Sequence, residues 1–367
     1  MNLHLVGGFL GSGKTTAILQ ATRFLTDEGQ RVGIITNEQG KHLVDTAFFQ
    51  SQALPVAQVT GGCICCHLDD FSQRVDDLVR DFDPQVIFAE SVGSCTDLVA
   101  TVLKPLLRLR EHVNTPASLT VFSDARLLRR FLNGEEMPFS DGIIYIFEKQ
   151  IEEAELVIIN KADLLSEMDR QKLSRMAEER YSDKQFRLQN SLDPNQARAW
   201  LNILEGNQPP RPTVSLDLDY DAYALGEGRF CWVDRHLRLT AQSAHALSFL
   251  GECILEICRQ LKSLPINIAH LKFLINARES TVRFNLTALE DIEERIDSLR
   301  IDLETLKPGD VELRINSMVE GDLSMVEKKI DTIILDTLSQ TGLRYSLQGG
   351  FTCVPGYPRP TQRIAND

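Results

Sequence analysis

The sequence contains no uninterrupted apolar run that approaches the length of a membrane-spanning helix. It also lacks an excess of positive charge, because 39 Lys and Arg face 52 Asp and Glu and give a formal net charge of -13. General binding to nucleic acid or to an anionic membrane requires a basic surface, so we expect protein, metal or small-molecule partners instead. No basic, cleavable leader precedes the first apolar run, and we therefore expect a cytoplasmic protein.

Cysteine is present but does not form the framework of a small secreted domain. The 367 residues include eight cysteines, and three of them lie within Cys63-Ile64-Cys65-Cys66. In a reducing compartment we expect them to be thiols and metal ligands rather than disulfides.

Short apolar runs alternate with longer amphipathic stretches over the first half of the chain, which predicts strands interleaved with helices. This pattern is typical of an α/β fold with a mostly parallel sheet flanked by helices, whose ligands gather at the carboxyl ends of the strands. The strands are predicted at Leu3 to Val6, Val32 to Thr36, Val86 to Ala89, Leu119 to Ser123 and Leu156 to Asn160.

The turn-forming stretch 205–212 is the best candidate for a domain boundary, because Pro209, Pro210 and Pro212 cannot continue a helix. We therefore predict a nucleotide-binding domain over 1–204, a linker over 205–212, a smaller α+β domain over 213–350 and an extended or disordered tail over 351–367. The second domain is predicted to pack one sheet against a layer of helices. Its strands are expected at Phe230 to Val233, Ile268 to Ile275, Thr281 to Asn285 and Val311 to Ile315, and its helices at Ser243 to Leu261 and Leu323 to Leu338.

A phosphate-binding loop follows the first predicted strand. Two glycines separated by four residues, Gly8 and Gly13, lead into Lys14 and Thr15 in the P-loop pattern, and Gly11 lies between them. The backbone N–H groups of such a loop surround phosphates, the lysine reaches the β and γ oxygens, and the threonine hydroxyl can hold Mg²⁺. The nucleotide-binding residues predicted here are Gly8, Gly11, Ser12, Gly13, Lys14, Thr15 and Thr16.

The quartet Asn160-Lys161-Ala162-Asp163 directly follows an apolar strand and predicts guanine as the base. The Asp163 carboxylate can accept from the N1 and the exocyclic amine of guanine, while Asn160 and the Lys161 stem hold the ring. The same four residues can also form an ordinary helix cap, but a P-loop upstream favours GTP over ATP.

The cysteine loop Gly61-Gly62-Cys63-Ile64-Cys65-Cys66 lies between these two motifs. Three thiolates from one short loop suit Zn²⁺ and similar ions and leave a coordination position open, which is typical of a transfer site. Cys65 and Cys66 are adjacent, so one of them can point toward a second chain, toward a distal ligand such as His67, or toward no ligand. Buried structural thiols or a redox pair are the alternatives.

Two carboxylates follow strands beside the P-loop. Glu90 is predicted to organise Mg²⁺ and the attacking water, and we expect it to be catalytic together with Lys14. Glu38 has three open roles: the Mg²⁺ shell, a ligand to the transition metal beside Cys63, Cys65 and Cys66, or a simple loop acid.

Taken in order, these motifs resemble those of CobW-like P-loop GTPases, relatives of the nickel-insertion GTPases of urease and hydrogenase. The resemblance covers about residues 1 to 204 and includes Asp45 and Asp124; its most specific part is Gly62-Cys63-Ile64-Cys65-Cys66. It implies a GTP-dependent metallochaperone that binds Zn²⁺, Co²⁺ or a similar ion at the cysteines and delivers it to a client metalloprotein.

The sequence departs from that family at three places. Lys41 stands where many members carry an acid, which puts an auxiliary metal ligand in doubt. Val92 interrupts the hydroxyl residues that usually precede Gly93, which can slow hydrolysis. The region after Pro212 lacks the histidine-rich stretch often found in such proteins.

We expect GTP and Mg²⁺ to assemble the thiolate site and hydrolysis or partner docking to release the ion, with slow intrinsic hydrolysis and a possible homodimer. Three alternatives stay open at this point. They are an ATP-using P-loop kinase, a regulatory GTPase with structural cysteines, and an accessory GTPase for a cobalamin or corrinoid enzyme.

Overall fold

The computed structural model describes residues 1–38, 40, 44–109, 116–206, 209–278, 280–290, 292–340 and 343–366. Lys41, one of the departures noted above, lies outside the described residues, as do residues 207–208 of the predicted linker. The chain forms two compact units. Unit 1 comprises Met1–Gln39, Gln52–Glu227 and Tyr357–Asp367, and unit 2 comprises Gly40–Ser51 and Gly228–Gly356.

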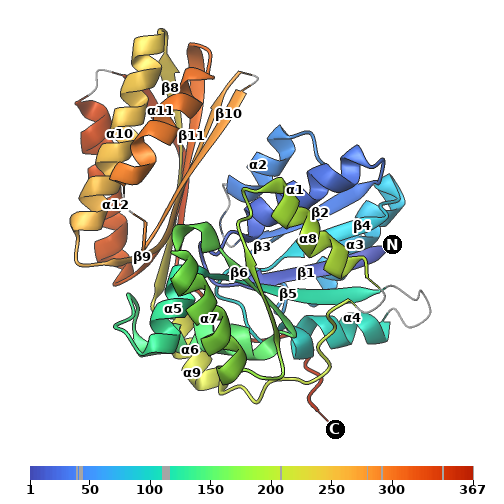
Figure 1. Ribbon diagram of the computed structural model, residues 1–367. Coiled ribbons are helices and arrows are strands. Elements are labelled where there is room, and N and C mark those ends of the chain that lie inside the picture. The colour runs from blue at the N-terminus through green and yellow to red at the C-terminus, as the bar shows by residue number, and fades with distance from the viewer. Residues whose placement is uncertain are drawn as a thin grey trace. The chain divides into compact units, whose positions relative to one another are not determined.

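Unit 1 contains a seven-stranded parallel sheet within the described residues, which confirms the predicted P-loop fold (Figure 1). The strands follow the order β3-β2-β4-β1-β5-β6-β7 across the sheet. Their bounds are β1 (Asn2–Gly8), β2 (Val32–Glu38), β3 (Val56–Thr60), β4 (Val86–Glu90), β5 (Ala117–Asp124), β6 (Leu156–Asn160) and β7 (Gln185–Gln189).

The parallel register brings the polar ends of these strands to one edge of the sheet. Val6 of β1 pairs with Glu90 at the end of β4, and Asp124 at the end of β5 pairs with Asn160 at the end of β6. Glu38 at the end of β2 pairs with Thr60. In a parallel sheet the carboxyl ends of the strands line the ligand crevice, so the predicted nucleotide residues share one edge.

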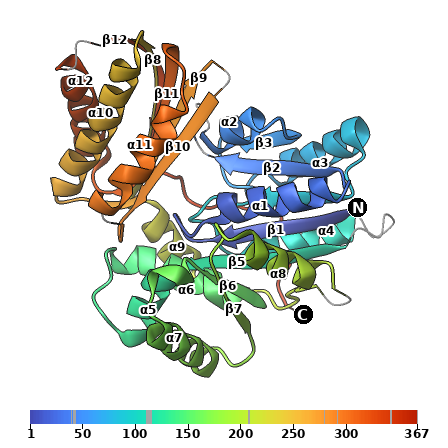
Figure 2. The ribbon, with the colours of Figure 1, turned by 45° about the horizontal axis from the view of Figure 1, so that its top comes forward.

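Helices flank both faces of this sheet. Figure 2 shows α1 and α8 side by side on one face, and α3 and α4 on the other. Several helices begin at a side-chain cap: Asp124 accepts from the N–H of Arg126 at the start of α5, and Asp193 accepts from the N–H of Asn195 at the start of α8. The bounds in unit 1 are α1 (Lys14–Asp27), α3 (Leu68–Phe82), η1 (Val99–Leu103), α4 (Lys104–Leu109), α5 (Ala125–Asn133), α6 (Asp141–Glu153), η2 (Ala162–Leu164), α7 (Glu167–Arg180), α8 (Pro194–Leu204) and α9 (Tyr220–Glu227).

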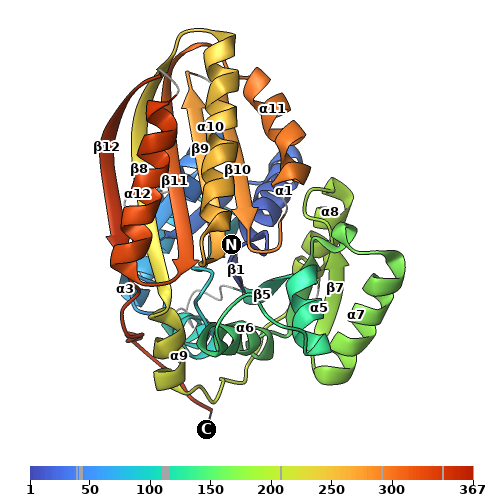
Figure 3. The same ribbon diagram turned by 90° about the vertical axis from the view of Figure 1, so that its left-hand side faces the viewer.

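Unit 2 is an antiparallel sheet with α10, α11 and α12 on one face, as predicted for the α+β domain (Figure 3). The sheet order is β10-β9-β11-β8-β12. Leu250 and Ile254 of α10 pack with Phe273 of β9 in a continuous apolar core. The bounds are β8 (Phe230–Ala241), α10 (Ala244–Ser263), β9 (Asn267–Ala277), β10 (Ser280–Thr287), η3 (Glu293–Arg295), α11 (Ile296–Glu304), β11 (Gly309–Glu320), α12 (Leu323–Ser339) and β12 (Arg344–Cys353).

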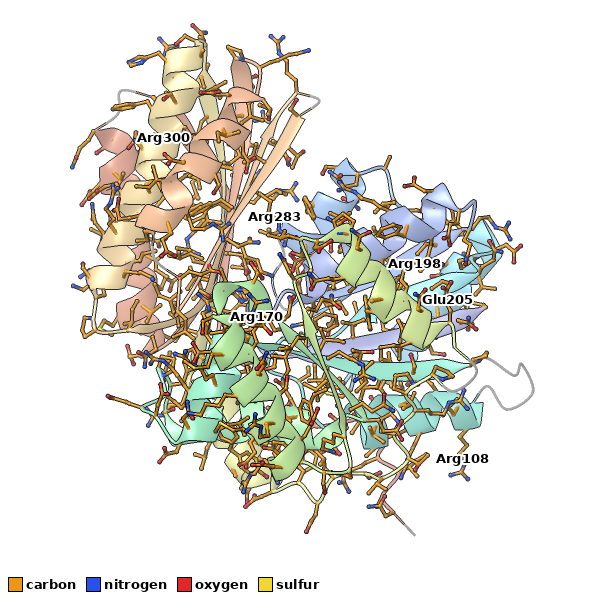
Figure 4. The ribbon with its side chains drawn as sticks, in the orientation of Figure 1. Arg108, Arg170, Arg198, Glu205, Arg283 and Arg300 are labelled. Atoms are coloured by element: carbon orange, nitrogen blue, oxygen red, sulfur yellow. A yellow bond between two sulfur atoms is a disulfide. The ribbon has the colours of Figure 1, made fainter. Side chains whose placement is uncertain are left out.

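One short helix of unit 2 comes from the first half of the sequence. Helix α2 (Val44–Ser51) leaves the nucleotide-binding part of the chain after β2 and packs on β9 and β10. Its Asp45 is buried and accepts from the Lys272 ammonium at 2.5 Å. Arg283, which is labelled in Figure 4, lies over the Phe48 ring with its guanidinium 4.4 Å from the ring centroid. Burial opposes ionisation of Asp45, but Lys272 and Arg283 outweigh it and lower its pKa.

The described boundary between the two units differs from the predicted linker. After α8 the chain stays with unit 1, because Leu119 donates its N–H to the carbonyl of Pro210 at 3.1 Å and Arg211 donates to the carbonyl of Ala117 at 3.0 Å. Helix α9 then packs on α6, with Gly226 close against Gly142. The prolines stop a helix here but do not end the domain, and the change of unit comes after Glu227.

The predicted tail over 351–367 also differs from the described structure. Residues 351–353 belong to β12, and residues 357–366 have no regular secondary structure but are hydrogen-bonded to unit 1. Among the helices that the structure describes, none is long and apolar enough to cross a membrane.

Candidate nucleotide and metal site

The loop between β1 and α1 has the conformation that its glycines permit. Gly8, Gly11 and Gly13 have φ values of 121°, 71° and 93°, in the left-handed region that favours glycine. A Cβ on Gly8 would collide with the backbone of Phe122, and one on Gly13 would collide with the amide of Asn160. The loop is therefore pressed against β5 and β6, and glycine is needed at both positions.

Lys14 lies inside this loop. Its ammonium donates to the carbonyls of Gly8 at 2.7 Å and Phe9 at 3.3 Å, and the residue is only 5% exposed. Lys14 is a buried cation at the start of α1, and the first backbone N–H groups of a helix have no partner within the helix, so this position suits the oxygens of a phosphate chain.

Thr15 and Glu90 form a pair of buried oxygen donors beside Lys14. The Thr15 hydroxyl donates to Glu90 Oε1 at 3.0 Å, because the register of β1 and β4 puts Glu90 directly beside the P-loop strand. A hydroxyl and a carboxylate are hard oxygen ligands of the kind that Mg²⁺ takes in nucleotide sites, so the residues fit this ion.

Asn160 connects three segments at the end of β6. Its amide donates to the carbonyl of Ser12 at 2.7 Å, and its Oδ1 accepts from the N–H and hydroxyl of Ser191 at 3.0 and 2.8 Å. The sequence identified Asn160 but missed Ser191, which follows the polar edge strand β7. The sequence could have indicated Ser191 only through the polar loop that follows β7, and β7 itself was not predicted.

The two charged residues after Asn160 lie in different surroundings: Lys161 forms an ion pair, and Asp163 is exposed. Lys161 has a left-handed backbone, with φ of 59°, and its ammonium lies 3.3 Å from Asp124 Oδ2. Burial opposes ionisation of Asp124, but the charge of Lys161 and the hydrogen bonds of Arg126 outweigh it and lower its pKa. Asp163 is exposed at the same edge of the sheet, where its carboxylate is accessible to a ligand.

The three cysteines of the loop lie together at the turn before α3. Among the described residues, the sulfurs of Cys63, Cys65 and Cys66 form a group whose atoms all lie within 4.8 Å of one another. Cys66 Sγ lies 3.4 Å from Cys63 Sγ and 3.8 Å from Cys65 Sγ, and burial raises the pKa of the Cys66 thiol. Such a cluster suits a soft divalent ion.

One detail of the cluster differs from the prediction of free thiols. The structure pairs Cys63 with Cys65 as a disulfide, because the tight turn brings the sulfurs at positions one and three to the same side. In this form two of the three sulfurs are not thiolates, so metal binding by all three requires reduction of the pair.

Asn37, at the end of β2, holds the cysteine loop by its side chain. Its amide donates to the carbonyls of Gly62 at 2.7 Å and Val59 at 3.2 Å, and its Oδ1 accepts from the N–H of Ile64 at 3.0 Å. Glu38 is the next residue along the chain and is 3% exposed. The sequence gave no sign of these hydrogen bonds of Asn37.

Glu38 and His67 do not belong to the sulfur group among the residues that the structure describes. His67 instead lies over Gly62, where a Cβ would meet its ring. Cys95, Cys231, Cys253 and Cys258 are buried and also lie outside the group within the described part of the chain.

Comparison with known proteins agrees with this arrangement. Residues 2–187 match the family model described as CobW/HypB/UreG, nucleotide-binding domain. The chain is 28% identical over 191 residues to the zinc chaperone YeiR of Escherichia coli (strain K12), covering 50% of this chain and 53% of the relative. It is 29% identical over 183 residues to the zinc chaperone CobW of Sinorhizobium sp, covering 44% and 51%. These matches span about half the length of the relatives.

Among solved structures, HypB from Helicobacter pylori in complex with nickel aligns with a TM-score of 0.40 and 16% identity, over 56% of this chain and 85% of that one. The family match spans half of the sequence and contains the P-loop, the cysteine loop and Asn160 to Asp163. The chain therefore belongs to the CobW/HypB/UreG family.

Proposed function

We propose that this chain is a GTP-binding and GTP-hydrolysing metallochaperone that couples its nucleotide state to the binding and delivery of a transition metal. The observation that carries the proposal is the set of hydrogen bonds from Asn37. This residue stands beside Glu38 at the carboxyl end of β2 and is bonded to Gly62 and Ile64 of the cysteine loop. A change at the nucleotide edge of β2 is thereby transmitted directly to the metal loop.

GTP is the proposed nucleotide because Asp163 is an exposed carboxylate two residues after the left-handed Lys161. A carboxylate accepts two hydrogen bonds from the N1 and exocyclic amine of guanine, whereas adenine presents an acceptor at N1. Asn160 is held by Ser12 and Ser191, so the base-binding turn is connected to the P-loop. Family membership supports the same choice over an ATP-using kinase.

The phosphate groups of GTP would be bound by the P-loop N–H groups and by the Lys14 ammonium. Thr15 and Glu90 would hold Mg²⁺, which neutralises charge on the transferred phosphoryl group when it is bound. Glu90 is also the acid closest in register to the P-loop strand and is proposed to orient the attacking water. Val92 after it is consistent with slow intrinsic hydrolysis that a client protein accelerates.

The proposed cargo is Zn²⁺, with Co²⁺ as the alternative. Thiolates accept both ions, and the relatives named above are called zinc chaperones. Because the matches cover about half of those relatives, the client metalloprotein is itself part of the proposal. A corrinoid enzyme as client requires the same cysteines and differs only in the metal. Glu38 as an additional ligand, a homodimer and a cytoplasmic location stay predictions.

The coupling has a definite energetic requirement. To change the loop from almost fully loaded to almost empty, the two nucleotide states must differ in metal affinity by about 5.5 kcal/mol. Gaining or losing one thiolate bond, or changing the bonds of Asn37 to the loop, can supply a large part of this difference.

Metal titration in three nucleotide states tests the proposal. Reduced protein is titrated with Zn²⁺ against a chelating dye in the presence of a non-hydrolysable GTP analogue, GDP or no nucleotide, and we expect the tightest binding with the analogue. A variant with Cys63, Cys65 and Cys66 replaced by Ser is the matched control and should bind no Zn²⁺ at the loop. Equal affinities in the three states of the unmodified protein would contradict the coupling.

A further inference from the structure

Residues 357–366 follow a path along the cysteine loop. Arg359 donates its backbone N–H to Cys66 Sγ at 3.3 Å. Thr361 donates its N–H to the carbonyl of Cys65 at 3.2 Å and its hydroxyl to the carbonyl of Cys66 at 2.8 Å. Three hydrogen bonds therefore join this segment to the two adjacent cysteines, and all the residues involved belong to unit 1.

Arg363, two residues after Thr361, holds the segment to unit 1. Arg363 donates to Asp97 Oδ2 at 2.7 Å and to the carbonyl of Leu216 at 2.7 Å, and Tyr220 donates its hydroxyl to the same Asp97 oxygen. The Asp97 side chain is 1% exposed, so the ion pair with Arg363 neutralises a buried carboxylate.

Ile364 and Asn366 form further hydrogen bonds to unit 1. Ile364 donates its N–H to the carbonyl of Ala100 at 2.8 Å, and Asn366 exchanges hydrogen bonds with the backbone of Ser215 at 2.6 and 2.8 Å. Residues 363–366 are thus held to unit 1 by side-chain and backbone bonds together, which fixes the position of Arg359 and Thr361 on the loop.

Only one residue of the stretch Pro358-Arg359-Pro360 has a backbone N–H that can donate to Cys66 Sγ. Pro358 and Pro360 have no N–H, so Arg359 supplies the only backbone donor among these three residues. A residue that precedes proline is restricted to extended conformations, which limits the directions in which that N–H can point. The sequence Pro358-Arg359-Pro360 therefore restricts the backbone around this donor, and the packing of the segment on unit 1 aligns the donor with Cys66 Sγ.

We propose that residues 357–366 are a positioning segment of the metal site, which orients the Cys65-Cys66 turn and stabilises the Cys66 thiolate through the Arg359 N–H. The inference rests on the proposed function, because it takes the three cysteines as metal ligands. Groups that hydrogen-bond to metal ligands fix their orientation, and losing one typically weakens metal binding about 10- to 100-fold. The ion pair of Arg363 with Asp97 is the latch that holds the segment in place.

Two substitutions at one position separate the backbone donor from the side chain. Arg359→Pro removes the N–H in a segment that is already extended between prolines, whereas Arg359→Ala removes only the side chain. We expect Arg359→Pro to bind Zn²⁺ about 10-fold more weakly than the unmodified protein and Arg359→Ala to bind it equally well. With Co²⁺ as the probe, Arg359→Pro should also alter the thiolate-to-metal absorption bands, which a remote structural change would leave unmoved.

The latch is tested by Arg363→Ala, with Arg31→Ala as the matched control, because Arg31 forms an exposed ion pair with Asp83 elsewhere in unit 1. We expect Arg363→Ala to weaken Zn²⁺ binding about 10-fold and Arg31→Ala to have no effect. Binding of the GTP analogue reports folding and should be unchanged in all variants.

Different results would overturn the positioning role of residues 357–366 and the proposed metal binding by the three cysteines. Unchanged Zn²⁺ affinity and Co²⁺ spectra in both Arg359→Pro and Arg363→Ala would overturn the positioning role, while the metal site at the cysteines would stand. If the unmodified protein bound no Zn²⁺ that is lost on replacing the three cysteines, the proposed function and this inference would both be overturned.

Discussion

Asn37 accepts the backbone N–H of Ile64 on its Oδ1 at 3.0 Å, and this bond fixes the middle of the cysteine loop to the end of β2. Replacing Asn37 by Ala removes this bond and the donors to Gly62 and Val59. Each such bond contributes about 1 kcal/mol, so we expect the ratio of Zn²⁺ affinities between the GTP-analogue and GDP states to fall about 10-fold. Titration with a chelating dye in both states measures it.

The control for this prediction is Asn133→Ala, since Asn133 is an exposed asparagine at the end of α5 that donates to the side chain of Glu135 at 2.8 Å. It should leave the ratio of affinities unchanged. If Asn37→Ala lowered affinity equally in both nucleotide states, Asn37 would support the loop without transmitting the state of the nucleotide.

Asp163 is expected to select guanine, and Asp163→Asn reverses the hydrogen-bonding character of the group that faces the base. Two hydrogen bonds to a charged acceptor are worth about 1.5 to 3 kcal/mol each, so GTP should bind at least 100-fold more weakly. Xanthosine triphosphate, which presents a carbonyl where guanine has an amine, should bind more tightly than to the unmodified protein. Asp183→Asn, at an exposed aspartate of the same unit, should change neither affinity.

The strands that the sequence failed to predict lie at sheet edges. β3 and β7 are the two outer strands of the parallel sheet, and β12 is an outer strand of the antiparallel sheet. A central strand such as β4 is buried throughout and appears as an apolar run, whereas β7, with the sequence Gln-Phe-Arg-Leu-Gln, buries only part of its side chains. A continuous apolar run indicates a strand that is buried on both faces, and the edge strand β7 lacks such a run.

The candidate site was predictable where its chemistry depends on local sequence. Three motifs each lie within one short stretch of sequence, and their spacing indicates phosphates, a soft metal and guanine: Gly8 to Thr16, Cys63 to Cys66, and Asn160 to Asp163. The contacts of Asn160 with Ser191 and of Cys66 with Arg359 join residues 31 and 293 positions apart. No local pattern encodes such pairings, because they depend on how the strands and the 357–366 segment pack.

Metal binding at the cysteine loop is expected to depend on its redox state. Cys63 and Cys65 are paired as a disulfide, and only Cys66 offers a thiol in that form. Oxidation removes two of the three thiolate ligands. The Zn²⁺ affinity of the oxidised protein should therefore be at least about 100-fold lower than that of the reduced protein. Thiol counting in denaturant should give eight thiols after reduction and six before, and a chelating dye measures the affinity.

The control for the redox prediction is the double variant Cys63→Ser/Cys65→Ser, because Cys66 Sγ lies 3.4 Å from Cys63 Sγ and can pair with it when only Cys65 is replaced. Its weaker Zn²⁺ binding should be the same before and after mild oxidation. Persistent loss of binding in the unmodified protein after the disulfide has been reduced again would contradict a reversible effect of this pair.

Glu153, at the end of α6, is expected to make the stability of unit 1 depend on pH. It is 3% exposed and accepts from the N–H of Val99 at 2.5 Å, and burial, with a smaller contribution from Asp97, raises its pKa from 4.5 to about 8. Lys184 and the hydrogen bonds from the backbone act in the opposite direction. Between pH 4.5 and 8 the folded protein therefore keeps a proton that the unfolded chain releases.

This proton difference destabilises the folded state as the pH rises through that range. The free energy of unfolding should fall by up to about 1.4 kcal/mol per pH unit from this group, with the loss beginning above pH 4.5 and ending above pH 8. Glu153→Gln keeps an acceptor for Val99 but carries no titrating proton, so it should gain stability relative to the unmodified protein as the pH rises from 5 to 8. Denaturant unfolding at several pH values measures this difference. Parallel curves for Glu153→Gln and the unmodified protein would mean that Glu153 is ionised in the folded state.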